Sequence, residues 1–233
     1  MFIKQVLRRI VPKRVKEFLT YDPKDFYSKK SFSQEGEDLM LDIMINYKEK
    51  GTYVDIGAHH PYKFSNTYFY YLKGWSGVCV DPIPRVGELF NKFRPKDKFV
   101  NKGIGLQKEV LSYYEFEDPA LNTMDKEVRD KRINQGHIFS AETKIKTDTL
   151  TAILDETMEG KFIDFMSIDV EGLELQVLMS NDWKKYRPVF LIIHYKSKNI
   201  DDCLSSKISV FLNQKGYRFY AKSFHSIFYK IRA

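Results

Sequence analysis

Five polar side chains follow five short apolar runs in this sequence. They are Asp55 after TYV, Asp81 after GVCV, Asn101 after KFV, Asp169 after FMSI and His194 after FLII. Any one of these residue types can simply end a turn or cap a helix. If the runs are parallel strands, however, their carboxyl ends meet at one edge of one sheet, where such sheets bind ligands. The repetition therefore predicts a ligand site built from strand ends.

The first of these runs continues as TYVDIGAHHP, which indicates the kind of ligand. Of a dinucleotide-type glycine fingerprint only Gly57 is present, so the segment lacks the cradle that a pyrophosphate needs. Gly57 still lets the backbone approach a ligand closely, and Asp81 can accept hydrogen bonds from both hydroxyls of a ribose. An adenosine ligand without a pyrophosphate, such as S-adenosylmethionine, fits this pattern. Ser65, Asn66 and Thr67, at the start of the next predicted helix, offer side-chain oxygens and free N–H groups to its carboxylate.

Two further carboxylates, Asp169 and Glu171, stand in the segment SIDVEGLE. Because side chains alternate along a strand, both leave the strand end towards the same side. Such a pair can share a divalent cation, or one member can act as a base that the other orients. The two residues can also cap the helix predicted to follow them. The sequence places no third carboxylate beside them, so we assign no metal ligands, although a magnesium-like ion is compatible with the pair.

Histidines offer the other candidate base. A neutral imidazole with a pKa of about 6.5 can take a hydroxyl proton near neutral pH, which makes His194 the first candidate; a structural histidine bonded to backbone is the alternative. His59 and His60 are adjacent, so both rings cannot easily face one metal ion. We expect His59 to line the pocket, or both residues to form the turn before Pro61.

Apolar runs alternate with helical patterns along most of the chain. The expected strands span residues 52–57, 77–82, 98–105, 162–172, 188–195 and part of 219–231; the expected helices span residues 65–75, 85–93, 173–183 and 200–217. This alternation predicts a mostly parallel sheet with helices on both faces. Residues 106–147 break the rhythm after the third strand, and we expect an insertion on the substrate side of the domain, either a lid or a flexible loop. Its Tyr113, Tyr114 and Phe116 could stack on a sugar or pack as strand residues.

Composition limits the partners. The 233 residues fit one domain, here residues 31–233, after a tail and linker of residues 1–30. Two cysteines, Cys79 and Cys203, lack metal-site spacing and favour a reduced, cytoplasmic setting. Residues 1–19 carry six basic residues and one acid, which is five of the seven net positive charges, so the nearly balanced remainder does not predict nucleic-acid binding.

The basic tail interleaves apolar and basic residues, and Pro12 interrupts it. It has no uncharged run of membrane-span length. Three expectations remain open: a helix packed on the domain, peripheral contact with anionic lipid at the inner membrane face, or contact with another macromolecule. The oligomeric state is not predicted.

Seven segments, in order, resemble the FkbM-type family of S-adenosylmethionine-dependent methyltransferases. They are SQEGED (33–38), VDIGAHHP (54–61), SNT (65–67), GWSGVCVDPIP (74–84), RPKD (94–97), FMSIDVEGLELQVL (165–178) and RP (187–188). The resemblance covers about residues 31–196 and implies a Rossmann-like class I methyltransferase fold. It also implies methyl transfer to a hydroxyl of a sugar or other polyhydroxy acceptor, a small molecule or glycan, in surface-glycan or natural-product biosynthesis.

The resemblance also implies roles for individual residues. Asp55, Gly57 and Ala58 would lie along the cofactor, and Asp81 would hold its ribose, with Pro82 shaping the following turn. Gln34, Glu35 and Asp38 would fold over the methionine end, and Asn101 would border the site. An alternative for the segment of residues 33–38 is a capping box with Ser33 as the N-cap. The family more often has an acid where this chain has His194, which leaves the base assignment open.

Two other functions compete with this prediction. A nicotinamide-dependent oxidoreductase can use the same kind of sheet, but the missing fingerprint glycines argue against it. A binding module could keep the fold without catalysis.

Overall fold

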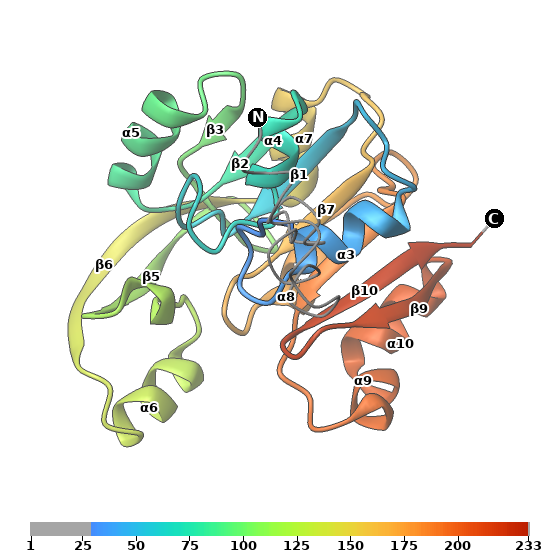
Figure 1. Cartoon of the computed structure of the whole chain (residues 1–233). Helices are drawn as coiled ribbons and strands as arrows, with labels where there is room; N and C mark the ends of the chain where they lie inside the picture. Colours follow the sequence, from blue (N-terminus) through green and yellow to red (C-terminus); the bar gives the residue numbers. More distant parts are fainter. Residues whose placement is uncertain (1–28, 233) are drawn as a thin grey trace, which may run out of the picture. The chain divides into compact units, whose positions relative to one another are not determined.

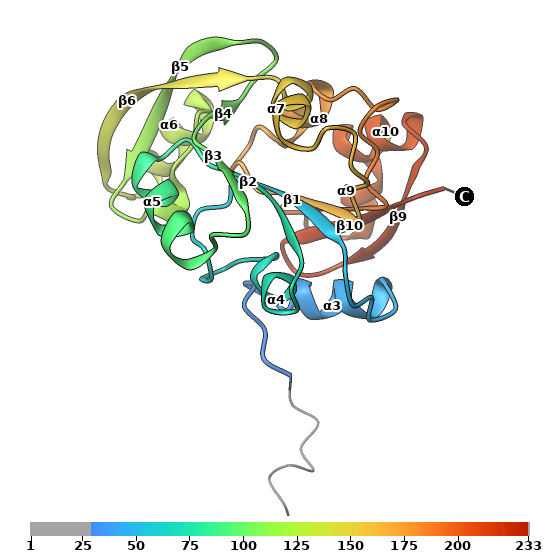
Figure 2. The same ribbon diagram turned by 90° about the horizontal axis from the view of Figure 1, so that it is seen from above.

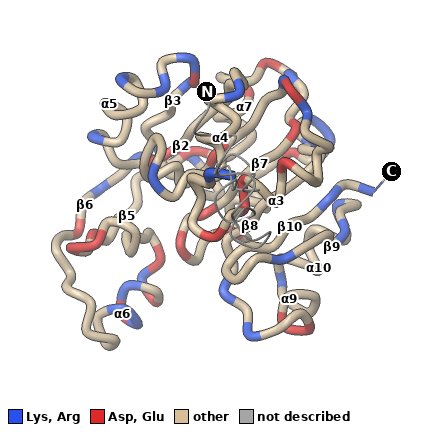
Figure 3. The backbone as a smooth tube through the Cα atoms, in the orientation of Figure 1, with Lys and Arg blue, Asp and Glu red and all other residues tan. Residues whose placement is uncertain are grey.

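The structure is a computed structural model, and it describes residues 29–232. Every helix and strand below lies in the unit formed by residues 31–233. The expectations for the basic tail, residues 1–19, fall outside the described residues. Among the helices that the structure describes, none is both long enough and apolar enough to cross a membrane. Lys and Arg positions and Asp and Glu positions are both spread along the described chain (Figure 3).

The main sheet has seven strands (Figure 1). In spatial order they are β3 (Lys98–Val100), β2 (Ser76–Val80), β1 (Thr52–Ile56), β7 (Phe165–Ile168), β8 (Phe190–His194), β10 (Ser226–Ile231) and β9 (Tyr217–Lys222). The strands from β3 to β8 run parallel, and β10 runs antiparallel to both of its neighbours. The predicted mostly parallel sheet is confirmed. Because β1, β2, β7 and β8 are parallel, their carboxyl ends lie at one edge.

Helices cover both faces of this sheet (Figure 2). On one face lie α3 (Glu37–Met44), α4 (Tyr68–Leu72) and α5 (Pro84–Phe93); on the other lie α7 (Leu150–Thr157), α8 (Glu174–Met179), α9 (Ile200–Ser205) and α10 (Lys207–Gln214). Within β1, Tyr53 packs in the first of these two cores, whereas Val54 and Ile56 pack in the second. The central strands β1, β7 and β8 are buried on both sides, which explains their continuous apolar runs in the sequence.

The predicted insertion is an ordered subdomain rather than a loop. It contains β5 (Glu109–Phe116), a 3-10 turn η2 (Pro119–Leu121), α6 (Lys126–Asn134) and β6 (Phe139–Asp148), and β6 also pairs with β4 (Gly103–Ile104). The expected strand of residues 98–105 is therefore split between two sheets. The charged segment that forms α6 begins at Asp125, whose side chain accepts from the N–H groups of Glu127 and Val128.

Three helix predictions need correction at their ends. Ser33 does not begin a helix: α3 starts at Glu37, after Gly36 with a φ of 86°. The helix expected over residues 65–75 is limited to α4, although Ser65 does accept from the N–H of Tyr68 at 3.1 Å. The helix expected over residues 200–217 is two helices, because Ser206 has an extended backbone and caps α10 instead of continuing α9.

Candidate active site

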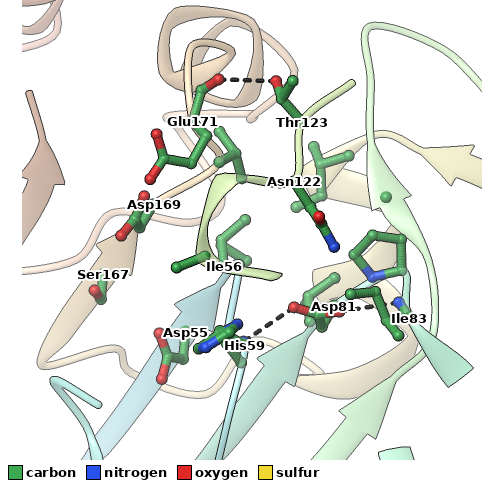
Figure 4. Close-up of a pocket in the computed structure, with 18 of the residues that line it drawn as sticks. Asp55, Ile56, His59, Asp81, Ile83, Asn122, Thr123, Ser167, Asp169 and Glu171 are labelled. Atoms are coloured by element: carbon green, nitrogen blue, oxygen red, sulfur yellow. Dashed lines mark hydrogen bonds between the residues drawn. The ribbon is translucent and has the colours of Figure 1, made fainter. Parts of the chain in front are cut away.

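A pocket opens at the carboxyl edge of β1, β2 and β7 (Figure 4). It is lined by residues 55–59, 64–66, 80–83, 102–104, 119–120, 122–124, 167 and 169–171, together with Gln34 and Tyr113. Three of the five strand-end residues predicted to form a site, Asp55, Asp81 and Asp169, therefore meet around one cavity. Residues of the insertion also line the pocket, and the substrate-side role of the insertion stays a prediction.

Ten of the predicted site residues line this pocket. They are Gln34, Asp55, Gly57, Ala58, Ser65, Asn66, Asp81, Pro82, Asp169 and Glu171. His59 lines it as well. The remaining five predicted residues, Glu35, Asp38, Thr67, Asn101 and His194, do not.

Gly57 is required by the close packing of the backbone around it. Its φ is 78°, and a Cβ at this position would lie 1.7 Å from the backbone oxygen of Asp169. Its N–H donates to the carbonyl of Val80 at 2.9 Å. Only glycine permits this backbone with so close a neighbour, and the close packing brings the ends of β1, β2 and β7 together around the pocket.

Asp81 has the geometry expected of a ribose-binding acid. Its two carboxylate oxygens accept from the N–H groups of His59 and Ile83, each at 2.9 Å. His59 reaches this position with a φ of 49°, in the left-handed region. Burial raises the pKa of Asp81 to about 6, and the two N–H groups only partly oppose that rise. Each oxygen keeps a second lone pair, so two ribose hydroxyls could still donate to this side chain.

Asp55 is held by a buried arginine that sequence reasoning did not assign to the site. Thr67 donates its hydroxyl to Asp55 at 2.5 Å, and Arg94 Nη1 donates to the same Thr67 oxygen at 3.0 Å. Arg94 is fully buried, and its Nε also bonds Asp97 at 2.7 Å. Burial raises the pKa of Asp55, whereas the charge of Arg94 lowers it. The only sequence signal for this network was the RPKD segment, residues 94–97. It was one of the segments that resemble the family, but the resemblance implied no role for Arg94 or Asp97.

The two residues before Thr67 face the pocket. Ser65 Oγ lies 3.3 Å from Arg94 Nη1, and the Asn66 amide donates to Ser167 at 3.0 Å. Thr67 itself is fully buried beneath them. Ser65 and Asn66 line the pocket, so their contact with a ligand carboxylate stays a prediction, whereas Thr67 donates to Asp55.

Three other predicted cofactor contacts serve the structure instead. Glu35 pairs with His225, accepting from its N–H at 2.8 Å and contacting its Nδ1. Asp38 is fully buried and accepts from the hydroxyls of Ser31 and Ser33 and the N–H of Phe32. Asn101 donates to the carbonyl of Asp81 at 3.0 Å, and so fixes the turn rather than a ligand.

Asp169, Glu171 and His194 gather where the pocket ends. Each offers one carboxylate or imidazole atom, and these atoms all lie within 4.8 Å of one another. His194 Nδ1 is 3.4 Å from Asp169 Oδ2. Burial, with the charge of Glu171, raises the pKa of Asp169 to about 8. The predicted pairing of the two carboxylates towards one side is confirmed (Figure 4).

The alternatives for these three residues are not observed. Helix α8 begins at Glu174 after Leu173 with no side-chain cap, so neither carboxylate caps it. Instead Glu174 accepts from the N–H groups of Val170 and Gly172. The His194 imidazole bonds no backbone group among the described residues: Nδ1 faces Asp169, and Nε2 is buried without a partner.

A second hollow adjoins the pocket at Glu171. It is lined by residues 128, 131–132 and 135 of α6, residues 171–172 and 174–175, residues 194–196 after β8, and residues 202 and 205–208 at the corner of α9 and α10. We call it the α6–α9 groove. His194 faces this groove rather than the pocket, and Glu171 lines both. The three-residue cluster therefore stands at the junction of two cavities.

Among the insertion aromatics, only Tyr113 lines the pocket. Tyr114 and Phe116 are buried, and the guanidinium of Arg129 lies over the Tyr114 ring at 4.5 Å. His60 belongs to the turn, because its Nδ1 accepts from the N–H groups of Tyr62 and Lys63. The expected sugar-stacking surface is thus reduced to Tyr113.

Comparisons with known proteins were made for the whole chain. The family model described as the methyltransferase FkbM domain matches residues 55–219. No curated protein matches the sequence. The solved structures that resemble it include the METTL16 methyltransferase domain, at 11% identity, a TM-score of 0.47, and coverage of 82% of this chain and 63% of that one.

Two further similar structures come from bacteria. A TehB-like SAM-dependent methyltransferase from Corynebacterium glutamicum has 9% identity and a TM-score of 0.44. The aligned region covers 98% of this chain and 97% of that one. A 1,6-didemethyltoxoflavin-N1-methyltransferase from Burkholderia thailandensis, solved with S-adenosylhomocysteine, has 10% identity and a TM-score of 0.44, with coverage of 94% and 86%. These similarities are too distant to support an argument, so the assignment rests on the family model, which spans most of the chain.

The matched region begins at Asp55. It contains all five strand-end residues that first indicated a ligand site: Asp55, Asp81, Asn101, Asp169 and His194. The doubly wound, mostly parallel sheet around them is the class I methyltransferase fold that the resemblance implied. The chain belongs to the FkbM family of S-adenosylmethionine-dependent methyltransferases.

Proposed function

We propose that this methyltransferase acts on oxygen, transferring a methyl group from S-adenosylmethionine to a hydroxyl of a sugar or other polyhydroxy acceptor. The observation that carries the proposal is the cluster of Asp169, Glu171 and His194 at the junction of the pocket and the α6–α9 groove. A cofactor in the pocket and an acceptor in the groove would meet at these side chains.

The pocket residues suit the two polar ends of the cofactor. Asp81 would accept hydrogen bonds from the ribose hydroxyls, beside the backbone of Gly57 and Ala58. Ser65 and Asn66 would bind the amino-acid end, with Gln34 closing over it. Asp55, held by Thr67 and Arg94, would present its carboxyl group near that end. Asp169, at the end of β7, lines the same pocket and would border the bound cofactor.

The groove suits a polar acceptor. Lys131, Lys196 and Lys207 line it, and none of them forms an ion pair with another residue of the described part of the chain. Together with Glu171 and His194 they present donors and acceptors to hydroxyl groups. Polar groups in a ligand site fix the orientation of the ligand, so these side chains could orient the hydroxyl groups of an acceptor.

The chemistry needed from the protein is limited. When bound, S-adenosylmethionine supplies an electrophilic methyl group, so the chain must align the acceptor oxygen with the carbon–sulfur bond and deal with the hydroxyl proton. The oxygen lone pair forms the new O–C bond, and the electrons of the C–S bond remain on sulfur. The Asp169, Glu171 and His194 cluster is the group of side chains in place to handle the proton.

A screen of acceptors tests the proposal. The full-length protein is incubated with isotope-labelled S-adenosylmethionine and a panel of free and nucleotide-linked sugars, with amines and thiols of similar size as controls. We expect labelled methyl ethers from one group of sugars, detected by mass spectrometry. Transfer confined to amines or thiols would overturn the assignment to oxygen.

Cofactor binding should weaken in acid because of Asp81. The ionised carboxylate of Asp81 can accept hydrogen bonds from both ribose hydroxyls. Its raised pKa of about 6 means that it is mostly ionised at pH 7.5 and mostly protonated at pH 5. The dissociation constant of S-adenosylhomocysteine should therefore rise about tenfold between pH 7.5 and pH 5, as measured by calorimetry.

The control for this prediction is Asp81→Asn. The charges that also act on Asp81, from Asp55 and Arg85, remain in that variant. It should bind more weakly than the wild type at pH 7.5 and show little further loss at pH 5. A wild-type affinity that is equal at the two pH values would remove Asp81 from the ribose site.

A further inference from the structure

We infer that Asp169, Glu171 and His194 bind a divalent cation, and that this cation holds the acceptor through two neighbouring hydroxyls. The catalytic use of the cation rests on the proposed function, but its binding does not. No residue of the described chain other than these three forms such a group of three possible ligands.

The spacing of the cluster is close to that of a coordination shell. One atom from each residue lies within 4.8 Å of the other two. Ligands about 2.1–2.2 Å from a cation are about 4.3 Å apart when opposite and about 3 Å apart when adjacent. The 3.4 Å between His194 Nδ1 and Asp169 Oδ2 is long for a hydrogen bond and near the adjacent distance. Side-chain shifts of less than about an ångström would bring the three atoms to these separations.

The cluster is also where polar atoms lack partners. Among the described residues, three buried side-chain polar atoms have no hydrogen bond, and two of them are Asp169 Oδ1 and His194 Nε2. The His194 side chain is only 12% exposed, so solvent does not readily replace the missing partner. Buried polar atoms without partners are rare and need an explanation, of which an absent ion is one. An ion beside His194 Nδ1 would account for Asp169 Oδ1, and it would account for His194 Nε2 only if the imidazole turned over so that Nε2 faced Asp169. The third atom, Asn181 Oδ1, belongs to a separate turn after α8.

Glu171 is held so that it faces Asp169. Its φ is 52°, in the left-handed region, and its carbonyl accepts from the Thr123 hydroxyl at 2.9 Å. Arg132 of α6 binds its Oε2, and no residue in the described chain bonds its Oε1. Figure 4 shows the two carboxylates directed towards each other. Two ionised carboxylates this close repel each other, and a cation between them would remove that repulsion. A second contact that orients a ligand is a regular feature of metal sites.

The ligand types limit the choice of ion. Two carboxylates suit Mg²⁺ and Mn²⁺, and an imidazole favours a first-row transition metal over Mg²⁺. A Mn²⁺-like ion satisfies both preferences. Three protein ligands leave coordination positions open, which is the property of a catalytic rather than a structural site. Two adjacent open positions match a vicinal diol, which makes a sugar with neighbouring free hydroxyls the substrate class.

The proton balance follows from coordination. A hydroxyl bound to the cation is more acidic than a free one, so its O–H bond breaks and the proton passes to water in the α6–α9 groove. The oxygen then forms the O–C bond as described above, and the sulfur keeps the electron pair of the broken C–S bond. His194 acts in this step as a ligand, which explains why it lies away from the cofactor pocket.

Electron paramagnetic resonance of Mn²⁺ tests the site without cofactor or acceptor. The full-length protein, first treated with chelator, is titrated with Mn²⁺, and free ion is measured from its solution signal. We expect one bound ion per chain, with binding weakened about tenfold or more in both His194→Ala and Asp169→Asn. The matched controls are His137→Ala and Asp201→Asn, which should bind as the wild type does. Circular dichroism establishes that each variant is folded.

Two outcomes would overturn the inference. One is that the folded wild type retains no Mn²⁺; the other is that the wild type and all four variants bind it equally. Methyl transfer to sugars that persists in excess chelator would also reject the cation while leaving the proposed function intact. Conversely, Mn²⁺ binding at this cluster without any sugar methylation would reject the proposed function and keep the site.

Discussion

Asp169→Asn is expected to slow methyl transfer by about 10²-fold or more, while S-adenosylhomocysteine still binds. Asparagine keeps the shape of the side chain but removes the charge that either accepts a proton or binds a cation. Asp169 lies 3.4 Å from His194 and within the same cluster as Glu171, so no neighbouring carboxylate can replace it without moving. Turnover is measured with the acceptor found in the screen, and binding by calorimetry.

The control for this variant is Asp182→Asn. Asp182 is an exposed turn residue whose carboxylate accepts a hydrogen bond from the backbone N–H of Lys184. It should leave turnover unchanged. His194→Ala should act in the same direction as Asp169→Asn, and the double variant should be little worse than either single one, because residues that act as one unit are not additive. Near-wild-type turnover in Asp169→Asn would remove the end of β7 from the mechanism.

Arg94→Met is expected to cost about 3–5 kcal/mol of the free energy of unfolding. Arg94 is fully buried, and its loss leaves the buried carboxylate of Asp97 without its cation and removes the donor to Thr67. Urea unfolding measures the loss. The exposed Arg218→Met is the matched control and should change stability by less than about 0.5 kcal/mol.

The same variant should also weaken cofactor binding, because Thr67 would no longer be fixed against Asp55. If Arg94→Met unfolds with the same free energy as the wild type, the buried network does not hold the pocket. If it is destabilised yet binds S-adenosylhomocysteine with unchanged affinity, the network stabilises the fold but does not position Asp55.

The strand ends were predictable because their pattern is local. Asp55, Asp81 and Asp169 each follow an apolar run, and the rule that parallel strands end at one edge then brings them together. The order of the strands and the antiparallel β10 were not predictable, since the sequence pattern does not specify which strands pair. Ser206, which divides α9 from α10, was overlooked because serine is tolerated within helices as well as at their caps.

Long-range partners explain the errors within the site. Glu35 was assigned to the cofactor from its local motif, but its partner is His225, which lies 190 positions later in the chain. Thr67 was grouped with Ser65 and Asn66 because burial cannot be read from adjacent polar residues. Glu171 pairs with Arg132, which lies in a segment whose charge pattern did not indicate a helix. In each case the deciding contact joins segments that sequence spacing does not relate.

The most direct test of the account is a calorimetric titration of the full-length protein with S-adenosylhomocysteine and with NAD at pH 7.5. The account holds that the pocket of Asp55, Gly57 and Asp81 takes an adenosine ligand and has no cradle for a pyrophosphate. It predicts clear binding of S-adenosylhomocysteine, weakened by Asp81→Asn, and no measurable binding of NAD. Tight binding of NAD without any response to S-adenosylhomocysteine would contradict it.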